Sequence, residues 1–233
     1  MAFPAIAAFN TSAVGPSSST THNVALPSGI VAGNLLLVVI CTYGGQVPAT
    51  PAGWASLGVV TWANSIGGPG KLCLFRKTAT GSEGATQAFT TSVADNSAHI
   101  SLRITGWNGT DIAASAGVDQ DNTASPNPDA LTPGWGAADD LWLAIMSCGG
   151  AAPAISSPPA AYTTAAQVTV NDGGGTFRLA VASRQLNAAS DNPGAFTLAA
   201  SELFTVAQTV SLRGASASLV PVLREHYRRM KAA

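Results

Sequence analysis

One segment of the chain occurs twice, and this repeat limits the possible folds more than any other feature. The first copy is PSGIVAGNLLLVVICTYGG (27–45), and the second is TPGWGAADDLWLAIMSCGG (132–150), in which Pro133 matches Pro27 at an offset of 106 positions. Each copy contains an unbroken apolar run, LLLVVI or LWLAIM, bounded by turn-forming residues. Such runs are typical of strands buried on both faces. They are too short to span a membrane as a helix, which takes about 20 residues.

The similarity continues beyond these runs. A turn with proline and an aromatic residue follows each one, TPAGW (50–54) and PPAAY (158–162). Next come RKTATGSEGATQAFT (76–90) and SRQLNAASDNPGAFT (183–197), and then ISLR (100–103) and VSLR (210–213) at an offset of 110 positions. Four blocks in one order predict an internal duplication of about 107 residues, too long a unit for a solenoid or a propeller blade.

The local pattern within each half indicates β-strands. In HISLRITGW (99–107) and TFRLAVASR (176–184) apolar and polar residues alternate, as in strands with one buried face and one polar face turned outward. Glycine and proline clusters separate such runs. We therefore expect an all-β chain, with an antiparallel β-sandwich or jelly roll at 1–215 built from halves at approximately 1–108 and 109–215. Two tandem sandwiches are the alternative, although the junction WNGTDIAASAGV (107–118) does not resemble a linker.

The end of the chain, residues 216–233, has a different pattern. It predicts a short basic amphipathic helix, with Ser218 as a plausible cap. The helix would serve as an assembly interface, with an apolar stripe of Leu219, Val222, Leu223, Tyr227 and Met230 and a basic face of Arg224, Arg228, Arg229 and Lys231. The alternative is a closing helix that packs on its own domain.

The composition favours assembly over recognition of charged partners. Only 10% of the residues are charged, compared with about 25% in an ordinary domain. The net charge of −1 and the pI near 6.2 provide no general attraction to nucleic acid or to an anionic membrane. Low charge weakens repulsion between copies and so permits self-assembly, whereas a neutral monomer with a threonine-rich surface is the alternative.

The sequence contains no pattern that predicts catalysis. The histidines, His22 in an expected loop, His99 and His226, have no metal-ligand spacing, and nucleophile-elbow and phosphate-loop motifs are absent. Cys41, Cys73 and Cys148 are expected as buried free thiols, with one disulfide as the alternative. We expect neither enzymatic activity nor a cofactor or metal. The N-terminal segment lacks the basic start of a secretory signal.

Two minor alternatives concern ligands. The stretch VDQDNT, with Asp119 and Asp121, is a weak candidate for Ca²⁺ binding in a polar loop. Exposed aromatic residues that stack on a sugar would come from a small set of candidates, of which one or two belong to the core: Trp54, Trp62, Trp107 and Trp135.

The order LPSGIVAGNLLLVVI, TPAGW, LFRKTATGSEGATQAFT and ISLRITGWNGTDIAASAG, within residues 23–213, resembles β-sandwich structural proteins of tailed bacteriophages and prophages. The chain departs from the family pattern at Asn34, where Asp is expected, and in its basic tail. The resemblance implies a lectin-like jelly roll and a virion protein, for capsid decoration or a tail or fibre, assembled in the host bacterial cytoplasm. Its partners would be copies of itself and other virion proteins. The alternative function is binding of a host glycan, and neither nucleic acid nor membrane insertion is expected.

Overall fold

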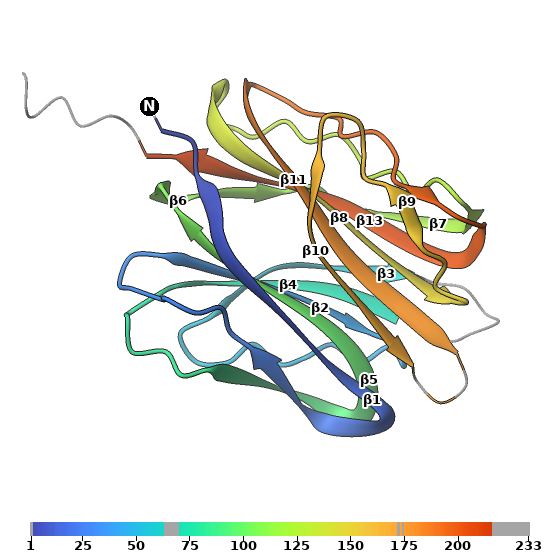
Figure 1. Cartoon of the computed structure of the whole chain (residues 1–233). Coiled ribbons are helices and arrows are strands. Elements are labelled where there is room, and N and C mark those ends of the chain that lie inside the picture. The colour runs from blue at the N-terminus through green and yellow to red at the C-terminus, as the bar shows by residue number, and fades with distance from the viewer. Residues whose placement is uncertain (1, 63–69, 172, 174, 216–233) are drawn as a thin grey trace, which may run out of the picture.

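The protein is described here by a computed structural model that covers residues 2–62, 70–171, 173 and 175–215. Every regular element in this part of the chain is a β-strand, and the strands form two large antiparallel sheets that lie as separate layers (Figure 1). The sheets pack face to face, as in a β-sandwich. The predicted all-β fold class with antiparallel sheets is confirmed.

The first sheet comes from the N-terminal half and has the strand order β1-β5-β2-β4-β3. Its strands are β1 (Ala5–Ala25), β2 (Leu35–Thr42), β3 (Ala55–Trp62), β4 (Gly70–Thr78) and β5 (Thr86–Thr105).

The second sheet comes from the C-terminal half and has the order β10-β11-β8-β13-β6, with β7 also paired to β13. Its strands are β6 (Trp107–Ala114), β7 (Val118–Thr123), β8 (Ala138–Gly150), β10 (Thr163–Asn171), β11 (Thr176–Ala188) and β13 (Glu202–Gly214). The short strands β9 (Ile155–Ser157) and β12 (Thr197–Leu198) pair with each other.

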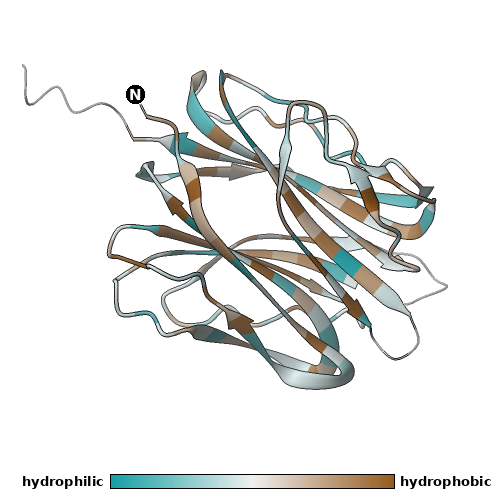
Figure 2. Ribbon diagram, in the orientation of Figure 1, coloured by the Kyte–Doolittle hydropathy of each residue, from teal (hydrophilic) through white to brown (hydrophobic). Residues whose placement is uncertain are grey.

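The two apolar runs of the repeat lie in the central strands β2 and β8, and every residue of both runs is buried. Alternate residues, such as Leu37 and Leu143, enter the core between the sheets. The other set covers the outer faces, where Val38 packs with Phe89 and Met146 packs with Phe196 in two further apolar clusters. Hydrophobic residues accordingly lie along the strands of both layers (Figure 2). The prediction of central strands buried on both faces is confirmed.

The paired strands β1 and β5 fold back over the first sheet. Although Ser12 and Ala25 lie on the same strand, Ala25 N donates to Ser12 Oγ at 3.0 Å. Thirteen extended residues would separate them by about 40 Å, so the strand reverses between them. The reversal coincides with register shifts between Val14 and Thr21. The folded-back ribbon covers Ser97, His99 and Ser101, which are buried. The prediction that the polar face of this part of β5 is turned outward is therefore wrong.

The two sheets meet along both sides. On one side β1 approaches β10, where a Cβ at Gly15 would overlap Val170 and the Asn171 carbonyl. On the other side β3 approaches β7, where a Cβ at Gly117 would overlap the Val60 side chain. Glycine is therefore required at both points because the edges come too close for a larger residue.

The chain passes from the first sheet to the second through Gly106, whose φ of +73° favours glycine. Before and after this residue, successive long strands stay within one sheet. A jelly roll has a chain that passes repeatedly between its sheets, so the predicted jelly-roll connectivity is not the one observed.

Candidate functional site

The assembly residues predicted from the sequence cannot be placed in the fold. The expected helix at 216–233 lies outside the described residues. This applies to all nine residues, Leu219, Val222, Leu223, Arg224, Tyr227, Arg228, Arg229, Met230 and Lys231. The other candidate sites belong to the two sheets.

Three edge strands, β1, β3 and β10, contain no Asp, Glu, Lys or Arg. β10 extends over nine residues without glycine or proline, and among the described residues it pairs with β11 only. Two of the large exposed hydrophobic side chains lie on the other edges, Phe9 on β1 at 52% and Val59 on β3 at 39% exposure. Soluble proteins usually protect such edges with charges, because an unpaired edge can pair with another chain. A register shift after Thr164 and the contact with Gly15 limit the open part of β10.

An open groove of about 490 Å³ lies where the beginning of β3 and the end of β4 approach the beginning of β6. Its lining includes Gly53, Trp54, Arg76, Lys77, Gly109 and Thr110. Asn108 fixes the β6 side, because its Oδ1 accepts from the backbone N–H groups of Thr110 at 3.0 Å and Asp111 at 2.9 Å. The fixed carbonyl of Thr110 accepts a hydrogen bond from Arg76 Nη1 at 3.3 Å. The groove is therefore bounded by rigid backbone on the β6 side.

The two cations of this groove have different partners. Lys77 Nζ lies 3.0 Å from Glu83 Oε1, so its charge is neutralised. Burial by itself would raise the pKa of Glu83, but hydrogen bonds from Thr80 N and Lys77 Nζ lower it to about 2. Arg76 has no carboxylate partner among the described residues, and its hydrogen bond to the Thr110 carbonyl leaves its charge uncompensated.

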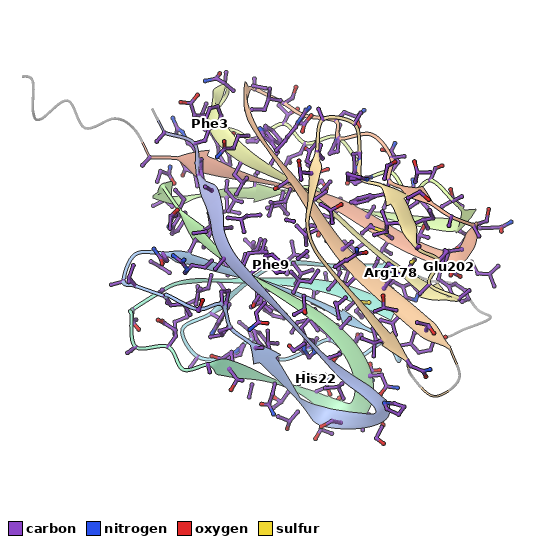
Figure 3. The ribbon with its side chains drawn as sticks, viewed as in Figure 1. Phe3, Phe9, His22, Arg178 and Glu202 are labelled. Carbon is purple, nitrogen blue, oxygen red and sulfur yellow. The ribbon has the colours of Figure 1, made fainter. Side chains whose placement is uncertain are left out.

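Two buried carboxylates bind the turns that follow the central strands. Asp95 accepts from the backbone N–H groups of Gly44 at 2.7 Å, Gln46 at 3.2 Å and Asn96 at 2.7 Å. Glu202 does the same after β8, accepting from Ala151 at 3.0 Å, Ala152 at 2.8 Å and Leu203 at 2.8 Å. Figure 3 shows Glu202 beside Arg178 at the end of the second sheet, and Arg178 Nη2 donates to the carbonyl of Ala152. These groups hold turns in place and are not exposed as an acidic site.

His22, on the folded-back part of β1 (Figure 3), and His99, on β5, form a buried polar cluster. Ser97 Oγ lies 2.6 Å from His22 Nδ1 and 2.6 Å from His99 Nε2, and Ser12 Oγ lies 2.9 Å from His99 Nδ1. Burial, with a smaller contribution from the neighbouring His22, lowers the pKa of His99 to about 3. Burial also lowers the pKa of His22, against the opposing effect of Asp95. The expected loop position of His22 is wrong, because the residue is buried in β1.

Another polar cluster attaches the loop before β12 to the second sheet. Arg184 Nε donates to Asp191 Oδ2 at 3.0 Å, and Tyr162 Oη donates to the same carboxylate. The Arg184 guanidinium also lies over the Tyr162 ring, 4.9 Å from its centre. Asp191 is buried, so this cluster has a structural role similar to that of the two carboxylates above.

Most of the ligand-binding residues predicted from the sequence are not placed as expected. Trp54, Trp62 and Trp107 are 8%, 0% and 7% exposed, so they belong to the core and cannot stack on a sugar with an open face. Trp135 is partly exposed, and its Nε1 donates to Asp140. Asp119 and Asp121 lie on strand β7 and not in the expected loop. Across the described ranges, no three potential ligands from His, Cys, Asp or Glu gather around a possible metal position.

The three cysteines, Cys41, Cys73 and Cys148, are buried and free, as predicted. No helix in the described part of the chain is long and apolar enough to cross a membrane.

Sequence reasoning missed the groove beside Arg76 and the turn-binding role of Asp95 and Glu202. Arg76 was visible only as part of the repeated block RKTATG, where nothing indicates that its partner is a carbonyl on a distant strand. The two carboxylates, in contrast, have a signal in the sequence, because they lie at an offset of 107 positions. Comparison of the chain with family models, with curated proteins and with solved structures finds no match in any of the three.

Proposed function

We propose that this protein is a non-enzymatic structural component of a bacteriophage virion that acts through self-assembly and docking on other virion proteins. The observation that supports the assembly role is the absence of charged residues from three edge strands, β1, β3 and β10. A second copy can add to an open edge through backbone hydrogen bonds. The low overall charge weakens repulsion between the two copies.

Within this proposal, β10 is the edge at which a second copy pairs. It has a run of strand-forming residues with no charge to oppose an identical strand. Antiparallel pairing of β10 with its own copy would create a symmetric dimer and extend the second sheet across the interface. The tail residues 216–233 provide the proposed contact with other virion proteins, through their apolar stripe and basic face.

The virion role itself is carried by the resemblance of residues 23–213 to phage structural proteins. It is tested by mass spectrometry of particles purified from a host that produces this chain. The full-length protein is expected in the particles, whereas a variant that lacks residues 217–233 should keep its melting temperature and fail to incorporate. A truncated protein that incorporates normally would refute the role of the tail, and absence of the full-length protein would refute the virion role.

We also infer that the two halves of the sandwich are related by duplication. Their sheets have the same strand order when β1 is matched with the β7–β6 edge. The registers also agree, because β4 places Arg76 opposite Leu37 and β11 places Ser183 opposite Leu143. Lys77 and Arg184 occupy corresponding places and each pairs with a carboxylate, Glu83 or Asp191, and Asp95 and Glu202 also correspond.

The alternative function is recognition of a host glycan, and the groove beside Arg76 favours it. Its volume of about 490 Å³ lies within the range of small-molecule sites. The groove lies at β3, β4 and β6 and does not involve β10, the edge proposed for pairing, so glycan binding and assembly are separable functions. Binding of saccharides to the purified protein, measured by calorimetry, tests this alternative.

A further inference from the structure

We propose that the groove between Gly53 and Thr110 binds the carboxylate of an acidic sugar, with Arg76 as the anion-binding residue. The proposal rests on saccharide binding, the second function above, and is independent of assembly. Four observations carry it: the groove, the uncompensated charge of Arg76, the rigid backbone opposite it, and a difference between the two halves.

The guanidinium of Arg76 is available to bind an anion. One hydrogen bond, from Nη1 to the Thr110 carbonyl, holds the guanidinium at the lining of the groove. A guanidinium has five N–H donors, and its planar fork matches a carboxylate. The neighbouring cation Lys77 is paired with Glu83, and Asp111 is paired with Arg213 at 3.0 Å. Within the described residues, the groove therefore has a net positive charge that comes from Arg76.

The second sheet has a serine, Ser183, at the place that Arg76 occupies in the first sheet. Arg76 pairs with Leu37 on one side and Ala55 on the other, whereas Ser183 pairs with Leu143 and Thr163 at the corresponding places of the second sheet. The adjacent cations, Lys77 and Arg184, have ion-pair partners in both halves. The cation at position 76 is thus an addition to the first half that the shared framework does not require.

The residues that line the groove favour a sugar over a peptide as the ligand. Thr78 provides a hydroxyl group, the Thr110 hydroxyl, which donates to Asp111 Oδ1, provides an acceptor, and Gly53 and Gly109 expose backbone. Trp54, the large apolar residue of the lining, is buried, and its Nε1 donates to Gln87. The groove therefore offers polar groups to ring hydroxyls but no apolar pocket for the side chains of a peptide. An acidic monosaccharide unit satisfies both the hydroxyls and Arg76.

The test is a calorimetric titration of the full-length protein with tetragalacturonate, with neutral cellotetraose of the same length and with a tetraglutamate peptide. We expect tetragalacturonate to bind most tightly and more weakly at high salt, because exposed charges are screened. Arg76→Gln should weaken this binding by about tenfold or more, and Arg76→Lys should weaken it less. The matched control is Lys71→Gln, at the other end of β4, where Nζ donates to Thr61 Oγ1; it should bind as the unmodified protein does.

A second measurement locates the binding site without a substitution, so that loss of binding in Arg76→Gln is not confused with a structural effect of that substitution. In NMR spectra of the unmodified protein, tetragalacturonate should shift the amide signals of Gly53, Gly109 and Thr110. Equal binding of the neutral sugar, or unchanged binding by Arg76→Gln, would overturn the role of Arg76 but leave saccharide binding standing. Preference for tetraglutamate would overturn the choice of a sugar. Failure of both saccharides to bind, with oligomer formation intact, would remove this inference and the glycan function while leaving the assembly proposal untouched.

Discussion

At the level of single residues, buried polar side chains hold the loops and the folded-back ribbon against the sheets. Asp95 and Glu202 bind the turns after the central strands, and Asp191 fixes the loop before β12. His22 and His99 join the folded-back part of β1 to the sheet beneath it. Since each of these groups is buried, its partners decide whether it stabilises or destabilises the fold.

The histidine pair predicts that acid destabilises the protein. The pKa of His99 is lowered from 6.5 to about 3 by burial and by His22, so the folded protein keeps this imidazole neutral while the unfolded chain takes up a proton. The stability that His99 contributes above pH 6.5 is therefore lost as the pH falls towards 3, by up to about 1.4 kcal/mol per pH unit. The pKa of His22 is lowered too, with Asp95 as the opposing charge.

Urea unfolding between pH 7 and pH 5 measures this effect above the range in which carboxylates such as Glu83 titrate. The urea midpoint should fall over this interval, and the fall should be smaller in His99→Gln. A midpoint that stays constant from pH 7 to pH 5 would contradict the lowered pKa of the pair.

The turn-binding carboxylates yield a second prediction at this scale. Asp95→Asn and Glu202→Gln should each lower the free energy of unfolding by about 1–3 kcal/mol, because an amide group replaces an acceptor oxygen that faces backbone N–H donors. Urea unfolding measures the change, with Asp121→Asn on the exposed part of β7 as the control. An effect no larger than that of the control would show that the turns hold without the charge.

At the level of elements, the repeat in the sequence predicted the central strands but not the way their outer faces are covered. The runs at β2 and β8 were recognisable because both alternate sets of side chains are apolar. The polar set on β5 suggested exposure, yet the reversal of β1 and β5 buries it. Alternation in a sequence reports the chemistry of a face and cannot report which distant segment packs on it.

The match between ISLR and VSLR shows a related limit. The sequence pairs Leu102 with Leu212, whereas the structure places Leu102 opposite Leu37 and Val210 opposite the corresponding Leu143. The sequence match is therefore shifted by two residues relative to the register. A shift of two keeps every side chain on the same face of the strand, so the hydrophobic pattern could not detect it.

The open edge of β10 leads to a prediction about assembly. Thr169→Lys adds a charge on an exposed position of this strand and should abolish self-association without lowering the melting temperature by more than a few degrees. Asn187→Lys is the control, since it adds the same charge at an exposed position of the second sheet, beside Asp139 and beyond the part of β11 that pairs with β10. Size-exclusion chromatography measures the oligomer, and an unchanged elution volume for Thr169→Lys would contradict pairing through β10.

At the level of the whole molecule, stability comes from one core between the sheets, to which both halves contribute, and from two outer clusters. The sequence indicated the composition of this core through its apolar runs. It could not indicate that each half forms one complete sheet, because the same strands are compatible with connections that cross between sheets. The groove beside Arg76 was beyond prediction for a similar reason, since it forms only where β4 approaches β6.

Because the cysteines are free and the core is apolar, dithiothreitol and EDTA should each leave the melting temperature unchanged. Differential scanning calorimetry checks both. A fall of more than about 5 °C with EDTA, which corresponds to a kcal/mol or more, would indicate a structural ion. A fall with dithiothreitol would indicate a disulfide.

The assembly role is the central claim, and the mass of the purified full-length protein in solution tests it most directly. Sedimentation equilibrium over a range of concentrations should yield a mass that is a multiple of the 23.3 kDa chain, beginning with the dimer expected from β10 pairing. The mass of Thr169→Lys should return to that of the single chain. A mass of 23.3 kDa for the unmodified protein at every concentration would contradict self-assembly through the sheet edges.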